Sequence, residues 1–155
     1  MKMEIERKFL VHTDRLPELA EFKLIEQAYL GFEPVTRVRV INNKKAFITV
    51  KGDGTLSRPE IECSIPVKDA ISMMALSMSH ICKIRYNYKV ATTDAHTWEI
   101  DRFMGALSGL WLAEIELESE DQEIDLPDWI REEVTEKPEY SNSSLAVKGL
   151  HGITI

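Results

Sequence analysis

Apolar and polar residues alternate along most of this chain, a pattern that indicates β-strands with differently surrounded faces. Turn-forming residues separate the alternating stretches, and Asn42–Lys45 reads as the loop of a β-hairpin. Strands are predicted over Glu4–Val11, Glu26–Phe32, Thr36–Ile41, Ala46–Lys51, Arg58–Ile65, Ile81–Val90, Thr97–Phe103 and Leu110–Ser119. A run of about eight short strands is typical of a β-barrel.

Helical spacing of apolar residues interrupts the strand pattern. Ala70 and Met73 recur at this spacing within Lys68–His80, which predicts an amphipathic helix. Pro127–Glu136 carries a proline at its start and predicts a second helix, and a short helical turn is expected over Ser143–Lys148. The chain is therefore expected to be mainly β (α+β). Residues 1–155 are expected to form one domain, because no repeat or low-complexity tract divides them.

Composition narrows the class of protein. The chain has 155 residues, of which 44% are apolar and 29% charged, ordinary values for a globular protein. Its formal net charge of −7 argues against general affinity for nucleic acid, which usually requires a basic excess. No apolar signal sequence opens the chain, and no stretch approaches the ~20 apolar residues of a membrane span. We expect a cytoplasmic monomer or homodimer, with no membrane or nucleic-acid partner.

The two cysteines do not suggest a metal cluster. Cys63 and Cys82 fall opposite the charged faces of their strands, so buried free thiols are expected.

Charged residues gather on one face of six of the predicted strands, mostly as pairs of the same sign. The pairs are Arg37 with Arg39, Glu60 with Glu62, Lys83 with Arg85, Glu99 with Asp101 and Glu114 with Glu116, while Lys51 lies beside Thr49. Two interpretations remain open. The face is either solvated and crossed by salt bridges, or turned inward, where confined cations need an anion and clustered carboxylates need a cation. Periodicity does not decide which face lies inside.

The N-terminal segment adds a motif with chemical meaning. Glu4, Glu6 and Lys8 lie on one face of an extended strand, because alternate side chains share a face. Two adjacent carboxylates beside an ammonium group suit a site that holds a divalent cation against an anion. A chain of phosphates with bound Mg²⁺ or Mn²⁺ would satisfy these carboxylates and the Arg and Lys pairs together.

The motifs and the order in which they occur along the chain resemble those of the CYTH superfamily, the triphosphate tunnel metalloenzymes. The resemblance runs through nearly the whole chain and begins with Glu4–Val11. It continues with Arg37-x-Arg39, Lys51, Arg58-x-Glu60-x-Glu62, Lys83-x-Arg85-Tyr86, Glu99-x-Asp101 and Glu114-x-Glu116. In length and pattern the chain is similar to the small single-domain bacterial members. The resemblance implies an eight-stranded antiparallel closed β-barrel that forms a tunnel, with helices packed on the outside.

The resemblance also implies roles for individual residues. Lys8, Arg37, Arg39, Lys51, Lys83 and Arg85 would bind the triphosphate. Glu4, Glu6 and Glu116, with Asp101 and Glu114, would hold divalent metals, either Mg²⁺ or Mn²⁺. Glu60 and Glu62 would belong to the acidic half of the tunnel. Lys83 is the candidate catalytic residue, because the resemblance places this lysine beside the scissile end of the substrate.

The opposite, apolar strand faces are expected to pack under the predicted helices. These faces carry Val38, Ile48, Ile61, Ile84, Ile100 and Ile115, and the helices are Lys68–His80 and Pro127–Glu136.

The expected activity is metal-dependent hydrolysis of a triphosphate, inorganic or organic. A class IV-type adenylate cyclase and a non-catalytic polyphosphate- or nucleotide-binding module remain alternatives. Other chemistries fit poorly, because the four histidines are scattered and no glycine-rich phosphate loop occurs. The identity of the triphosphate stays open, since members of the superfamily bind the triphosphate group in the same way.

Overall fold

The computed structural model describes residues 1–90, 96–153 and 155. Within these residues it has nine β-strands, two α-helices and three short 3₁₀ turns. The strands are β1 (Lys2–Val11), β2 (Phe22–Phe32), β3 (Val35–Ile41), β4 (Lys45–Lys51), β5 (Ser57–Ile65), β6 (His80–Lys89), β7 (Thr97–Phe103), β8 (Trp111–Glu116) and β9 (Ile130–Glu133). The helices are α1 (Val67–Met74) and α2 (Asn142–Lys148), and the turns are η1 (Thr13–Arg15), η2 (Gly105–Leu107) and η3 (Pro138–Tyr140). No helix in the described ranges has the length and apolar character needed to cross a bilayer.

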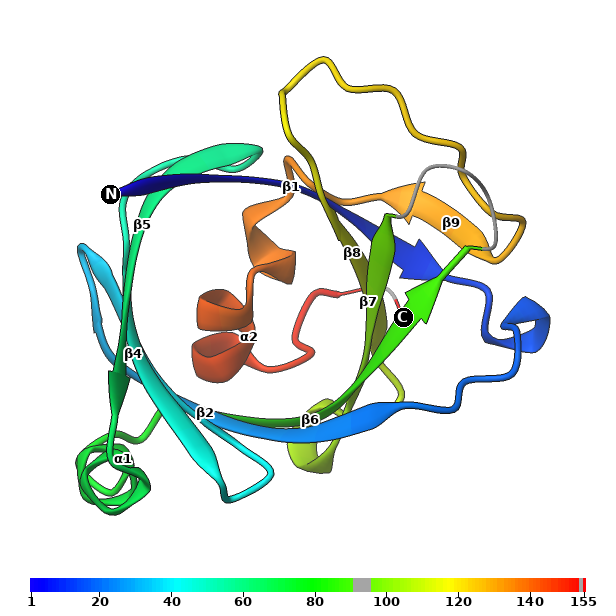
Figure 1. Cartoon of the computed structure of the whole chain (residues 1–155). Coiled ribbons are helices and arrows are strands. Elements are labelled where there is room, and N and C mark those ends of the chain that lie inside the picture. The colour runs from blue at the N-terminus through cyan, green and yellow to red at the C-terminus, as the bar shows by residue number, and fades with distance from the viewer. Residues whose placement is uncertain (91–95, 154) are drawn as a thin grey trace.

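The strands form one antiparallel sheet that closes on itself (Figure 1). Its order is β5-β4-β3-β2-β6-β7-β8-β1, and β1 pairs again with β5, where Glu4 lies opposite Arg58. All of the predicted strands are present, and all except Thr97–Phe103 have shifted bounds. The predicted eight-stranded closed barrel is therefore confirmed. Because side chains alternate along each strand, every second residue points into the barrel.

The segment predicted as a helix over Pro127–Glu136 is a turn followed by β9, so that prediction is wrong. β1 leaves β5 after Ile5, and its free edge would otherwise expose unpaired backbone groups. β9 pairs with the end of β1 and supplies partners for this edge. Trp129 and Val134, which flank β9, are only 3% and 1% exposed. These tertiary contacts outweigh the local helical preference of the segment.

The other predicted helix is shorter than expected. α1 ends at Met74 rather than His80, because residues 75–79 form the turn that leads into β6. The Ser77 hydroxyl donates a hydrogen bond of 2.7 Å to the Tyr29 carbonyl oxygen and holds this turn against β2. Met78 is 99% exposed, so it does not continue the apolar face of α1.

Two apolar clusters cover the outer face of the barrel. On one side α1 packs as predicted, with Ala70 among Val38 and Ile48 of β3 and β4. On the other side Ile100 and Ile115 pack against Trp129, in the loop before β9 rather than in a helix.

Parts of the outer face stay uncovered. Ile61 is 52% exposed and Ile84 is partly exposed, while Cys63 and Cys82 are exposed free thiols. The predictions that Ile61 packs under a helix and that both cysteines are buried are therefore wrong. The reason is the length of α1, whose eight residues span only about 12 Å and pack on β2, β3 and β4.

The interior of the barrel is apolar at one end. Tyr140 of η3 and Leu145 of α2 pack there with Leu10, Phe103 and Leu112, which continue the inward rows of β1, β7 and β8. Figure 1 shows α2 within the ring of strands. Whereas α1 lies outside the barrel as expected, α2 thus enters it and closes one end.

The helix that closes this end is short and capped. The predicted helical turn over Ser143–Lys148 is confirmed and begins one residue earlier, at Asn142. The Ser141 hydroxyl accepts a hydrogen bond of 3.2 Å from the Ser144 N–H and caps the first turn.

Candidate functional site

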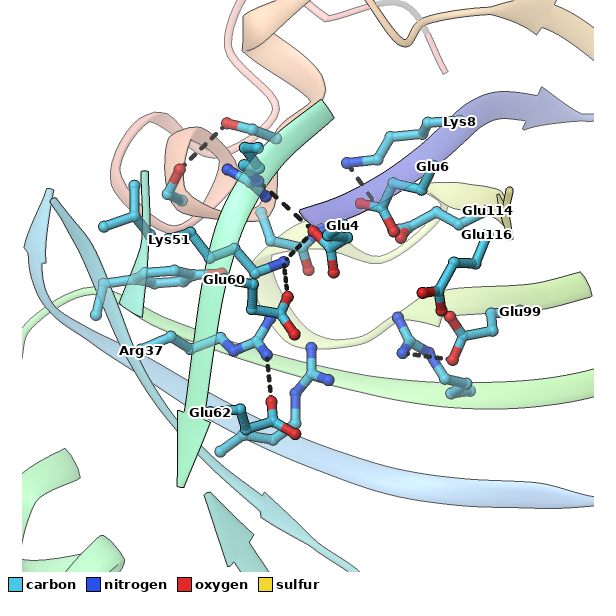
Figure 2. A pocket seen from close by; sticks show the side chains of 18 of the residues that line it. Glu4, Glu6, Lys8, Arg37, Lys51, Glu60, Glu62, Glu99, Glu114 and Glu116 are labelled. Atoms are coloured by element: carbon cyan, nitrogen blue, oxygen red, sulfur yellow. Dashed lines mark hydrogen bonds and ion pairs between the residues drawn. The ribbon is translucent and has the colours of Figure 1, made fainter. Parts of the chain in front are cut away.

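The charged strand faces turn inward and line a cavity of about 270 Å³ (Figure 2). All eight barrel strands contribute to its wall, together with Ser141–Ser143 at the start of α2. The wall includes the predicted residues Glu4, Glu6, Lys8, Arg37, Arg39, Lys51, Glu60, Glu62, Lys83, Arg85, Glu114 and Glu116. The inward interpretation of these faces is therefore correct, and the solvated-face alternative is excluded.

The basic side chains of this cavity are shielded from water. Lys83 is 1% exposed, while Arg37 and Arg85 are each 8% exposed. Burial lowers the pKa of Lys83 to about 7, with the charge of Asp101 acting in the opposite direction. Burial also lowers the pKa of Arg39, and the charges of Arg37 and Arg85 add to this effect. Crowded cations of this kind produce a positive potential that a bound anion would relieve.

Carboxyl groups meet in pairs on the same wall. Figure 2 shows Glu6 beside Glu114, and Glu4 beside Glu60. Burial, followed by the charges of Glu114 and Glu4, raises the pKa of Glu6 to about 8. The neighbouring carboxylates thus oppose ionisation of Glu6, and a bound cation would relieve this repulsion.

The carboxylates of this wall are suitable ligands for a hard divalent cation, although they do not converge on one point. Within the described residues, no group of three or more Asp, Glu, His or Cys side chains forms a ready metal site. Glu6 and Glu116 lie opposite each other on the paired strands β1 and β8, and Glu114 and Glu4 occupy neighbouring inward positions. Side chains at such positions are within reach of one another. Carboxylate oxygens are also the ligands that Mg²⁺ prefers.

Ion pairs connect the acidic and basic residues. Lys51 Nζ lies 2.7 Å from Glu4 Oε1 and 3.3 Å from Glu60 Oε2. Arg37 Nη2 lies 3.7 Å from Glu62 Oε2. The wall is thus mostly polar and its charges largely compensate one another, so a bound anion must replace some of these ion pairs with its own.

Asp101 lies behind the basic residues and is fully buried. Arg85 binds both of its carboxylate oxygens, at 2.7 and 2.8 Å, and Lys83 Nζ lies 2.7 Å from Oδ2. Burial opposes ionisation of Asp101, but the charges of Arg85 and Lys83 prevail and lower its pKa to about 2. These contacts orient two cations and engage both oxygens of the predicted metal ligand.

Some residues of the site received no role at the level of sequence. Arg58, which belongs to the motif Arg58-x-Glu60-x-Glu62, lines the cavity with its Nε 3.6 Å from Glu4 Oε1. Gln27 and Asn142 contact Arg39 and Lys83. No sequence signal connects these two amides, because they meet only where α2 enters the barrel.

The interior of the closed antiparallel barrel is rich in both cations and carboxylates, a combination suited to a small polyanion with a metal ion. The chain belongs to the CYTH family, whose CYTH domain model matches residues 2–149. It is 40% identical over 153 residues to an inorganic triphosphatase of Acetivibrio thermocellus, covering 94% of each chain. It is 39% identical over 150 residues to an inorganic triphosphatase of Nitrosomonas europaea, covering 93% of this chain and 97% of the relative. The crystal structure of an inorganic triphosphatase superposes with a TM-score of 0.68 at 36% identity, covering 94% of this chain and 95% of the other.

Proposed function

We propose that this protein hydrolyses inorganic tripolyphosphate inside the barrel, with the help of a divalent metal. The enclosed, charged cavity carries the proposal, because a small polyanion with a metal ion satisfies both sets of buried charges. The names of the two relatives, both inorganic triphosphatases, support it.

Six cations are proposed to bind the triphosphate. They are Lys8, Arg37, Arg39, Lys51, Lys83 and Arg85, and all of them line the cavity. Guanidinium groups can bind two phosphate oxygens at once, whereas the lysines act as point charges. Burial in the barrel strengthens each interaction, because competing water is excluded.

The polarity of the lining residues favours an inorganic substrate over a nucleotide. Apart from Tyr29 and Val35, the lining residues are charged or polar. The Tyr29 ring is buried and stacks on Phe32 with 6.0 Å between ring centroids, so it is engaged within the protein. Pockets for organic ligands are usually lined by apolar and aromatic groups. The described lining therefore offers little that would hold an adenine or a thiamine ring.

Glu4, Glu6, Glu114 and Glu116 are proposed to hold the metal, either Mg²⁺ or Mn²⁺, and Glu60 and Glu62 complete the acidic side. When bound, the ion would neutralise charge that develops on the phosphate oxygens. Asp101 was expected among the ligands. Because its oxygens bind Arg85 and Lys83, we propose instead that it orients these two residues.

Lys83 is proposed as the catalytic residue. Its ammonium group would hold the attacking water or a terminal phosphate oxygen, and the arginines would stabilise the charge that spreads over the transferred phosphoryl group. The apolar end formed by Leu145 and Tyr140 closes the barrel and keeps bulk water from that side.

A substrate screen tests the proposed function. The purified protein is incubated with tripolyphosphate, ATP, GTP or thiamine triphosphate, with Mg²⁺, Mn²⁺ or EDTA, and orthophosphate and cyclic AMP are measured. We expect phosphate release from tripolyphosphate at least as fast as from ATP, and only with metal. Cyclic AMP and pyrophosphate from ATP would favour a cyclase instead, and tight binding without turnover would favour a binding module. We also propose that the protein is cytoplasmic and is a monomer or a homodimer.

A further inference from the structure

Two uncharged side chains lie between the basic residues near the closed end of the barrel. We call Gln27 of β2 and Asn142 of α2 the amide bridge. Gln27 Nε2 donates a hydrogen bond to Asn142 Oδ1 at 3.3 Å, and a second one to the Tyr29 hydroxyl at 2.9 Å. Gln27 is fully buried, and Asn142 lines the cavity. The bridge thus joins a barrel strand to the helix that enters the barrel (Figure 1).

The amide bridge binds one N–H group of each of two cations. Arg39 Nε donates to Gln27 Oε1 at 2.8 Å, and Lys83 Nζ donates to Asn142 Oδ1 at 2.8 Å. Lys83 also binds Asp101 at 2.7 Å. A lysine ammonium has three N–H donors, so these two contacts determine where the remaining donor points. Arg39 is held through Nε, which leaves its terminal nitrogens to bind phosphate oxygens.

The bridge is neutral, and this distinguishes it from the carboxylates nearby. Asp101 orients Arg85 and Lys83 but also compensates their charge. An amide oxygen fixes the direction of an N–H group and leaves the positive charge available to an anion. Since Arg39 and Lys83 repel each other and Arg85, an uncharged group bound to both cations also holds them in place.

We propose that Asn142 and Gln27 are positioning residues for triphosphate hydrolysis, which hold Lys83 and Arg39 with their free N–H groups toward the substrate. The proposal rests on the proposed function and goes beyond it, because it makes α2 a working part of the site as well as the closure of the barrel. Neither residue is proposed to contact the reacting atoms. Both act by placing Lys83 and Arg39, and misplacement of such groups by about 1 Å is enough to lower a rate ~10²-fold.

Asn142→Ala tests this role. We expect kcat for tripolyphosphate to fall by roughly 10- to 100-fold, with KM changed by no more than about threefold, because the other cations still bind the substrate. In a Lys83→Ala background the same change should cause little further loss, since the residue that Asn142 positions is already gone. Val147→Ala is the matched control: Val147 is 58% exposed on the same helix and should leave both constants unchanged.

Asn142→Asp separates orientation from charge. This variant keeps an oxygen that accepts from Lys83 but adds a negative charge. We therefore expect its kcat to lie between those of the unmutated protein and Asn142→Ala, and its KM to be raised. Gln27→Glu keeps an oxygen for Arg39 but loses the N–H donors to Tyr29 and Asn142, so we expect a raised KM and a lower kcat than Asn142→Asp gives. Thermal melting of each variant shows that it is folded, and Asn142→Ser replaces the alanine variant if that one is not.

The outcomes are distinguishable. An equal loss for Asn142→Ala with and without Lys83 would overturn the positioning role and leave only a structural role for α2. An Asn142→Asp variant with the kinetics of Asn142→Ala and an unchanged KM would overturn the argument from neutrality. If the unmutated protein releases no phosphate from tripolyphosphate, the proposed function itself fails and this role fails with it.

Discussion

Replacing Asp101 with asparagine tests whether the buried ion pairs behind the cavity stabilise the barrel. Asp101 is fully buried and accepts three short contacts of 2.7–2.8 Å from Arg85 and Lys83. Asparagine preserves the shape of the side chain but removes the charge and one acceptor. Two cations that are 8% and 1% exposed would then lose their shared counter-charge.

The expected loss of stability is large. Removing one partner of a buried pair typically lowers the free energy of unfolding by about 3–5 kcal/mol, because an uncompensated charge remains. Glu114 lies near enough to repel Asp101, and relief of that repulsion places the expectation toward about 3 kcal/mol. For a chain of this length each kcal/mol corresponds to roughly 2–4 °C in Tm. We therefore expect Tm to fall by roughly 6–12 °C.

Urea unfolding and thermal melting measure this loss. The matched control is Glu132→Gln, which breaks an exposed pair of similar length, 2.6 Å from Glu132 to Lys137. That change should leave the free energy of unfolding nearly unchanged, because water screens an exposed pair. Tripolyphosphate in EDTA should raise Tm more for Asp101→Asn than for the unmutated protein, because the anion supplies the missing charge. A loss for Asp101→Asn no larger than that of the control would refute the reasoning.

Three further predictions concern activity and packing. Glu6→Gln should lower turnover at least ~10²-fold while the fold survives, and EDTA should abolish turnover of the unmutated protein; full activity in EDTA would contradict the metal role. Lys83→Ala should lower kcat more than it raises KM, because five other proposed cations still bind the substrate, and the reverse pattern in steady-state kinetics would contradict its catalytic role. Trp129→Ala should lower the free energy of unfolding by about 3–5 kcal/mol, since its ring lies 5.3 Å from that of Trp98 in the outer cluster; a loss below about 1 kcal/mol in urea unfolding would contradict this packing.

The alternation of residues along the chain determined the strands and the content of each face. It grouped Arg37 with Arg39 and Glu114 with Glu116 without any knowledge of their neighbours, because side-chain direction in a strand follows from local geometry. It did not determine which face lies inside. That depends on the pairing of β1 with β5, which closes the sheet and brings together residues more than fifty positions apart.

Only the tertiary structure decided the features that depend on partners distant in sequence. Residues 130–133 became a strand because β1 offered a free edge, not because of their own composition. α2 was predictable as a short helix, yet its place inside the barrel depends on the apolar ends of several inward rows, where Leu145 meets Leu10 and Phe103. The contact between Asn142 and Lys83 follows from that placement. Local periodicity reports how one segment is built, whereas burial and backbone pairing are properties of the whole barrel and exist only once it has closed.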